Sequence, residues 1–265
     1  MRTYKIVLSV CLALLAVAGA YGAFMYVYTD SKFAPVPLLQ APQTQAPHSD
    51  YTAPHVRFIH QVNTPARARR KDGKFGGFEV DVWAQNNHFL AAHDAQEAAR
   101  NIPLSAIFEA VKYPAQKVWW LDLKQELTAE QVDALVQLAG QFGIPKEHLL
   151  FEASAGPTAQ LISQKKLHLL LQLPEGFEED ENDPQKRAEL NAQALVLWQE
   201  YQPAAVSASF GKYGHLKAYF PNMPKAIYYS ATVRPSLKKN LMSAKMKQDP
   251  SVLIFMVDEY TWVNL

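Results

Sequence analysis

The sequence predicts an α/β protein: a (β/α)8 barrel of the TIM type, preceded by an N-terminal transmembrane helix and a Pro-rich linker. Short, mostly apolar runs alternate with helical patterns between residues 55 and 265, as expected for parallel strands covered on both sides. Polar residues stand where several of these runs end, which is where barrel enzymes carry their active sites. An open, doubly wound sheet is the alternative, but no G-x-G-x-x-G motif follows the first run to indicate a dinucleotide site.

Residues 1–29 are expected to form a transmembrane anchor or a signal peptide. The segment Ile6–Tyr28 is almost entirely apolar, and Arg2 and Lys5 precede it. A helix of this length spans roughly 34 Å, enough to cross a bilayer, and the basic flank favours a cytoplasmic N-terminus. Small residues at Ala18–Ala20 offer a signal-peptide cleavage site as the alternative. Because the apolar run continues past them, we expect a membrane-anchored, extracytoplasmic domain (periplasmic or cell-surface), which would be secreted if the segment is cleaved.

Residues 30–54 are rich in Pro, Gln, Ala and Ser, as in "APVPLLQAPQTQAPHSDYTAP", and are expected to form an extended linker. Residues 55–265 then form the barrel domain. The net charge of +1 disfavours a nucleic-acid partner. Cys11 is the only cysteine, so no disulfide can form within the chain.

Eight strands are expected in the barrel domain, each a run of apolar and β-branched or aromatic residues. They are Val56–Gln61, Gly77–Trp83, Val118–Leu123, Leu149–Ala153, Leu167–Leu171, Ala205–Ser209, Ala226–Ser230 and Val252–Val257. Two helices stand out between them. One runs from Thr128 to Gly143 and opens with a Thr128…Gln131 capping box, and the other runs from Asp183 to Tyr201.

The second predicted strand carries the clearest chemical signal. Glu79 and Asp81 alternate with apolar neighbours in "FEVDV", so both carboxylates point to one face of a strand that otherwise looks buried. Other polar residues follow the ends of neighbouring strands, and Glu152 is a weaker addition to the set. The main candidates at this mouth of the barrel are His60, Glu79, Asp81, His93, Asp122 and Lys124.

Three acids that converge at one mouth predict a site for Mg²⁺ or Ca²⁺, because these hard cations prefer oxygen ligands. Buried carboxylates without such a partner would be costly. Hard cations bind imidazole poorly, so the two histidines are expected to act as acid and base. Lys124 offers a fixed positive charge for a phosphate oxygen. Together these groups indicate displacement at phosphorus. A glycosidase needs two opposed carboxylates, and acids at positions i and i+2 of one strand suit a shared metal better.

The motifs "IHQVN", "FEVDV", "AHD" and "LDLK" resemble those of the glycerophosphodiester phosphodiesterase superfamily of PLC-like barrels. Within it they are most similar to the sphingomyelinase D branch, and the menorin family is a plausible neighbour. The resemblance covers about the first third of the barrel domain, and only the pattern matches beyond it. The first motif of the glycerophosphodiesterases reads H-R-G, whereas Gln61 and Val62 follow His60 in this chain. The third acid here is Asp122, where those enzymes have a glutamate.

The resemblance implies a role for each matching residue. His60 and His93 would be the catalytic histidines, and Lys124 would be the catalytic lysine beside the metal-binding carboxylates. Asn63 would contact the substrate phosphate or the loop that carries His60, Lys124 would contact the substrate phosphate, and Trp262 is a candidate for lining the substrate pocket. The implied metal ligands are Glu79, Asp81 and Asp122.

The expected function is that of a divalent-metal-dependent phosphodiesterase acting on a glycerophosphodiester or a phospholipid-type substrate. Hydrolysis and attack by an internal hydroxyl, which gives a cyclic phosphate, both remain open. The alternative is a membrane-tethered binding or adaptor protein that uses the same barrel without turnover. The complete set of two histidines and three acids favours the enzyme.

Overall fold

The structure of the chain is a computed structural model. The structure describes residues 2–32, 57–85, 88–177, 183–229 and 243–257. The predicted linker and Trp262 therefore lie outside the described residues, apart from the first few linker positions.

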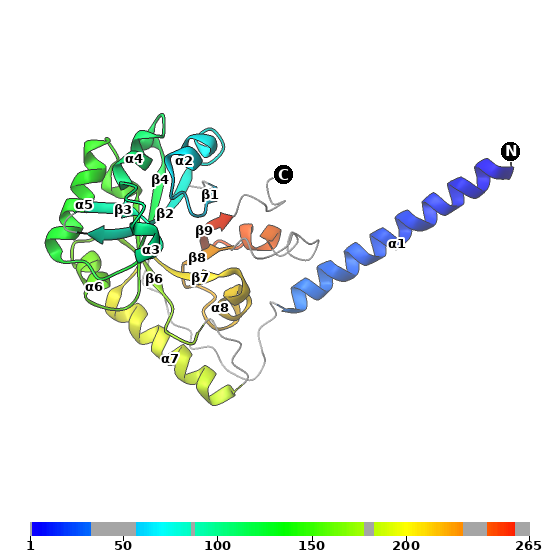
Figure 1. Cartoon of the computed structure of the whole chain (residues 1–265). Coiled ribbons are helices and arrows are strands. Elements are labelled where there is room, and N and C mark those ends of the chain that lie inside the picture. The colour runs from blue at the N-terminus through cyan, green and yellow to red at the C-terminus, as the bar shows by residue number, and fades with distance from the viewer. Residues whose placement is uncertain (1, 33–56, 86–87, 178–182, 230–242, 258–265) are drawn as a thin grey trace.

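Eight parallel strands close into a barrel, which confirms the predicted (β/α)8 architecture (Figure 1). Closure comes from the short first strand, which pairs with the second strand on one side and with the last strand on the other. The strands of the barrel are β1 (Phe58–Ile59), β2 (Gly77–Gln85), β4 (Val118–Leu123), β5 (Leu149–Ala153), β6 (His168–Gln172), β7 (Ala205–Ser209), β8 (Lys225–Tyr228) and β9 (Val252–Val257).

One further strand, β3 (His88–Ala91), lies outside the barrel and pairs antiparallel with the end of β2. This pairing carries β2 on to Gln85, two residues beyond the end that the apolar pattern predicts. The first strand is shorter than expected, because Gln61 takes a left-handed conformation with φ 53° and turns the chain away. Gly77 allows β1 and β2 to approach, since a Cβ there would lie 2.5 Å from the ring of Phe58.

Helices cover the outside of the barrel, and both helices predicted in detail are present. In α5 (Ala129–Gln141), Thr128 and Gln131 form the expected capping box. In α7 (Pro184–Tyr201), Asp183 accepts a hydrogen bond from the backbone N–H of Gln185. The other labelled helices of the barrel domain are α2 (Pro65–Lys71), α3 (Ala95–Ala98), α4 (Leu104–Glu109), α6 (Pro157–Gln164) and α8 (Tyr213–Tyr219), with short 3-10 turns at Pro114–Gln116, Lys146–His148 and Phe210–Lys212. Residues 243–247, before β9, are also helical.

The interior of the barrel is apolar at its N-terminal end and polar at its C-terminal end. Trp120 lies inside with Phe58 and Leu150, whereas the preceding Trp119 points outward and packs on Phe108 of α4 with ring centroids 4.6 Å apart. This alternation along β4 means that Asp122, two residues after Trp120, also points inward. The apolar layers thus form a floor beneath the polar mouth.

The N-terminal segment forms α1 (Arg2–Lys32). Within the part of the chain that the structure describes, no helix has the length and apolarity together that crossing a membrane requires, so the transmembrane helix predicted for residues 1–29 is not supported.

Candidate functional site

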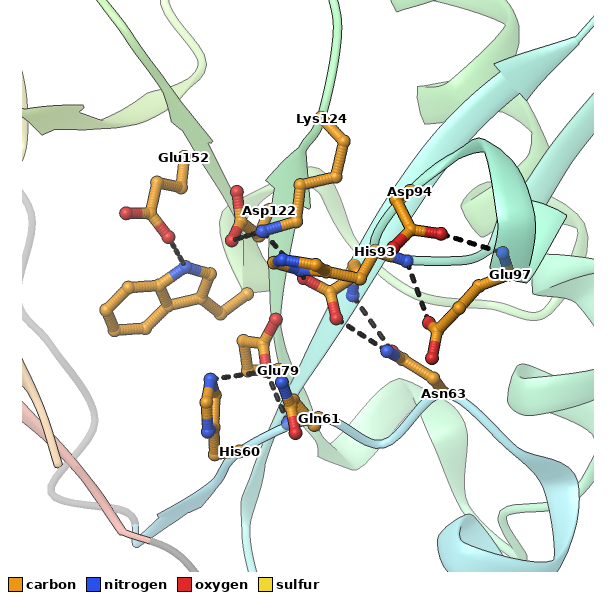
Figure 2. Close-up of polar contacts among 12 residues, drawn as sticks. His60, Gln61, Asn63, Glu79, His93, Asp94, Glu97, Asp122, Lys124 and Glu152 are labelled. Carbon is orange, nitrogen blue, oxygen red and sulfur yellow. Dashed lines mark hydrogen bonds and ion pairs between the residues drawn. The ribbon is translucent and has the colours of Figure 1, made fainter. Parts of the chain in front are cut away.

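Three carboxylates meet at the C-terminal mouth of the barrel, as the sequence predicts (Figure 2). Glu79 and Asp81 come from β2, and Asp122 comes from β4. Asp81 and Asp122 are register partners on adjacent strands, so they lie at the same level of the barrel. One oxygen from each of the three lies within 4.8 Å of the others. Glu79 and Asp81 are buried, and the side chain of Asp122 is 14% exposed.

Lys124 follows Asp122 on the same face and is the cation closest to the acids. Its Nζ lies 2.8 Å from Asp81 Oδ1 and 2.5 Å from Asp122 Oδ2. Burial by itself would lower the pKa of Lys124, but the two carboxylates outweigh it and raise that pKa. The lysine is therefore a fixed positive charge at neutral pH.

The single positive charge of one ammonium group does not compensate the negative charge of three carboxylates, and the pKa values of the acids reflect this excess of negative charge. Burial raises the pKa of Glu79 well above its usual value, and the charges of Asp81 and Asp122 raise it further. Burial also raises the pKa of Asp122, against the opposing effect of Lys124. For Asp81, burial is outweighed by Lys124 and by hydrogen bonds, so its pKa is lowered.

The carboxylates also have unused oxygens. Glu79 Oε1 and Asp122 Oδ1 are buried, and neither has a hydrogen-bond partner among the described residues. A buried acceptor without a donor is costly and rare in folded proteins. A hard divalent cation would satisfy both oxygens and supply the missing positive charge, and an all-oxygen donor set suits Mg²⁺ and Ca²⁺ alike. The residues present therefore fit such an ion.

The turn after β1 brings His60 and its neighbours to the carboxylates. His60 Nε2 lies 3.8 Å from Glu79 Oε2. The left-handed conformation of Gln61 directs its backbone N–H at the same carboxylate oxygen. Asn63 makes two hydrogen bonds with Asp81. Its Nδ2 donates to Asp81 Oδ2 over 2.5 Å, and its Oδ1 accepts from the Asp81 backbone N–H over 3.0 Å. Hydrogen bonds from this turn thus orient two of the three acids, Glu79 and Asp81.

His93 reaches the mouth from the chain that follows β3. Its Nδ1 lies 3.2 Å from Asp81 Oδ1, and its side chain is 54% exposed. Asp94 caps α3 by accepting the Glu97 backbone N–H, and Glu97 Oε2 accepts the His93 backbone N–H over 3.0 Å. The two predicted catalytic histidines therefore both lie at the mouth, His60 beside Glu79 and His93 beside Asp81 (Figure 2).

Glu152 adds a fourth buried acid to the mouth. It lies on β5 in register with Asp122, and it accepts a hydrogen bond of 2.6 Å from the indole N–H of Trp120. Gln172, at the end of β6, donates to its other oxygen over 3.3 Å. Burial, followed by the charge of Asp122, raises the pKa of Glu152 to about 8. Gln172 is not predicted from the sequence, although its place at the end of a strand is the signal that marks the other residues.

Comparisons with known proteins bear on the fold alone. No protein-family model and no curated protein matches the chain. Among solved structures, similar chains include a glycerophosphodiester phosphodiesterase from Parabacteroides distasonis, with 10% identity, a TM-score of 0.51, and 77% of this chain and 92% of that chain covered. An orotidine 5'-monophosphate decarboxylase from Metallosphaera sedula has 15% identity and a TM-score of 0.46, with 77% and 87% covered. A phosphoribosyl anthranilate isomerase from Thermococcus kodakaraensis has 14% identity, the same TM-score and the same coverage.

The sequence identities of 10% to 15% are too low for a function to be inferred from the similarity. The same architecture serves unrelated reactions. The glycerophosphodiester phosphodiesterase structure therefore supports the barrel fold alone, and not the sphingomyelinase D or the menorin branch.

Proposed function

We propose that the protein is a divalent-metal-dependent phosphodiesterase that acts on glycerophosphodiester or phospholipid-type substrates. One observation carries this proposal: three carboxylates, two of which have a buried oxygen without a hydrogen-bond partner among the described residues, share a barrel mouth with a lysine and two histidines. Metal, fixed cation and paired acid–base groups are the parts that displacement at a phosphate diester requires.

Each residue has a distinct part in this proposal. A divalent ion held by Glu79, Asp81 and Asp122 would stabilise negative charge on the phosphate. Lys124 holds its ammonium group beside the acids, in position to contact a phosphate oxygen. The imidazoles of His60 and His93 are the groups available at the mouth to accept a proton from the attacking hydroxyl and to donate one to the leaving oxygen.

Asn63 is proposed to serve the site in two ways. Its hydrogen bonds hold Asp81 in one orientation, and such partners of metal ligands tune affinity and activity. The resemblance also implies a contact between Asn63 and the substrate phosphate. The same resemblance assigns Trp262 to the substrate pocket, and that assignment remains a proposal because the residue lies outside the described part of the chain.

We also propose that α1 attaches the barrel to a membrane on the extracytoplasmic side, where phospholipid head groups would be within reach. In this helix Leu14, Leu15 and Val17 are between 64% and 69% exposed. Covering such apolar surface is favourable. Flotation of the full chain with phospholipid vesicles tests the attachment, and a Leu14→Glu/Leu15→Glu variant should float less.

The function is tested by ³¹P NMR on the full-length protein after chelation. The panel contains glycerophosphodiesters and lysophospholipids, each with and without Mg²⁺ or Ca²⁺. New phosphorus signals should require the ion and should vanish in His60→Ala and in Asp122→Asn. His88→Ala and Asp133→Asn are matched controls at exposed positions away from the mouth, and they should retain turnover. The chemical shift of the product separates a cyclic phosphate from an open phosphomonoester.

Absence of turnover across the panel, with the metal still bound, would refute the enzyme and leave a binding protein on the same barrel. Turnover that persists in His60→Ala and in Asp122→Asn would place the activity elsewhere.

A further inference from the structure

A cavity of about 230 Å³ opens beside the catalytic mouth, on the side of His93. Its walls include Asn63 and His93, together with Arg67 of α2, Glu97 of α3 and Arg100. Asn63 and His93 also bind Asp81, so the same two side chains border both the acidic mouth and this cavity. The cavity therefore adjoins the mouth.

The charged groups of the cavity differ in sign from those of the mouth. Among the described residues that line the cavity, two carry guanidinium groups and one carries a carboxylate. Arg67 is held in place by a hydrogen bond of 3.0 Å from its Nη2 to the backbone carbonyl of His60. A guanidinium group offers paired donors that match a carboxylate or a phosphate.

The acid in the cavity is already engaged. Glu97 Oε2 accepts the backbone N–H of His93, and Glu97 Oε1 lies 3.7 Å from Arg100 Nη1. The side chain of Arg100 is 66% exposed, and ion pairs of this kind are weak. An incoming anion can therefore compete for Arg100 without breaking a strong interaction.

The size of the cavity limits what it holds. Pockets for drug-sized ligands have volumes of about 300–1,000 Å³, so 230 Å³ suits a small polar group. We infer that the cavity binds a second anionic group of the substrate, a carboxylate or a phosphate, carried by a small head group next to the reacting phosphate. This inference rests on the proposed function, which places the reacting phosphate at the mouth.

Two probes of almost the same shape test the inference without turnover. Both 3-phosphoglycerate and glycerol 3-phosphate carry one phosphate, but only the first has a carboxylate. Calorimetric titration of the full-length protein in the presence of Mg²⁺ should show that 3-phosphoglycerate binds about tenfold more tightly, as expected for one charge-assisted pair.

Three variants assign the preference to the cavity. Arg100→Gln, at an exposed position, should reduce the ratio of the two affinities to about one, and Arg67→Gln should do the same if its circular dichroism stays native. Arg69→Gln replaces an exposed arginine of the same helix as Arg67 and should keep the wild-type ratio. Equal binding of the two probes by the wild type, or a ratio that survives in Arg100→Gln, would overturn the inference.

The outcomes also separate this inference from the proposed function. Turnover of diesters without a preference for the carboxylate probe would keep the enzyme and remove the anion site. A preference that depends on Arg100 in a protein without turnover would keep the anion site and remove the enzyme.

Discussion

Glu152→Gln is expected to stabilise the protein increasingly as the pH rises. In the folded chain, burial and the charge of Asp122 raise the pKa of Glu152 from 4.5 to about 8. Between these two pH values the folded state keeps a proton that the unfolded state releases, so the free energy of unfolding falls as the pH rises. The stability that the protonated Glu152 gives to the folded state is fully present below pH 4.5, and it is lost by the time the pH passes the folded-state pKa.

The size of the change in unfolding free energy follows from the difference between the unfolded-state and folded-state pKa values of Glu152. One pH unit corresponds to about 1.4 kcal/mol, so the full interval is worth about 5 kcal/mol, and the part between pH 5 and pH 8 about 4 kcal/mol. Glutamine has the shape of the protonated acid and keeps an oxygen that accepts the indole N–H of Trp120. It does not ionise, so the variant avoids this loss. The stability difference between variant and wild type should therefore be small at pH 5 and about 4 kcal/mol at pH 8.

Urea unfolding followed by tryptophan fluorescence measures the difference at both pH values. The protein is kept in a chelator, because a cation beside Asp122 would itself lower the pKa of Glu152. The other acids of the mouth titrate in both proteins, so their effect largely cancels in the comparison. A difference that is the same at pH 5 and pH 8 would refute the argument that Glu152 is held protonated by its surroundings.

Three other substitutions test separate parts of the structure. Gly77→Ala should destabilise the barrel by about 2 kcal/mol in urea unfolding, since the added Cβ meets the ring of Phe58 at 2.5 Å; an unchanged midpoint would mean that β1 and β2 are not this close. Thr128→Ala should cost about 1 kcal/mol by the same assay, through loss of the α5 cap, and should leave Mg²⁺ affinity as it is. Asn63→Ala should weaken Mg²⁺ binding in calorimetry about tenfold or more, because Asp81 loses two hydrogen bonds; wild-type affinity would contradict the role given to this side chain.

Much of the barrel is predictable because its strands are short apolar runs with clear ends. Both ends of β4, β5, β7 and β9 agree with the sequence pattern. The carboxylates of Glu79 and Asp81 are predictable for a related reason, since alternation on a strand fixes the face to which a side chain points.

Features that depend on distant contacts are not predictable in this way. The left-handed turn at Gln61 shortens β1 without a glycine to mark it. The extension of β2 to Gln85 depends on β3, whose pairing has no strong local pattern. The cavity beside His93 joins Arg67 and Arg100, which are far apart in the chain and come together only in the fold.

Glu79, Asp81 and Asp122 are proposed to hold a divalent cation at the barrel mouth. Calorimetric titration of Mn²⁺ into the chelator-treated, full-length protein tests it directly, with Asp122→Asn as the variant and Asp133→Asn as the control on the exposed face of α5. We predict one ion per chain in the wild type and in the control, and no such binding in Asp122→Asn. Equal binding by all three proteins, or none by the wild type, would contradict the account.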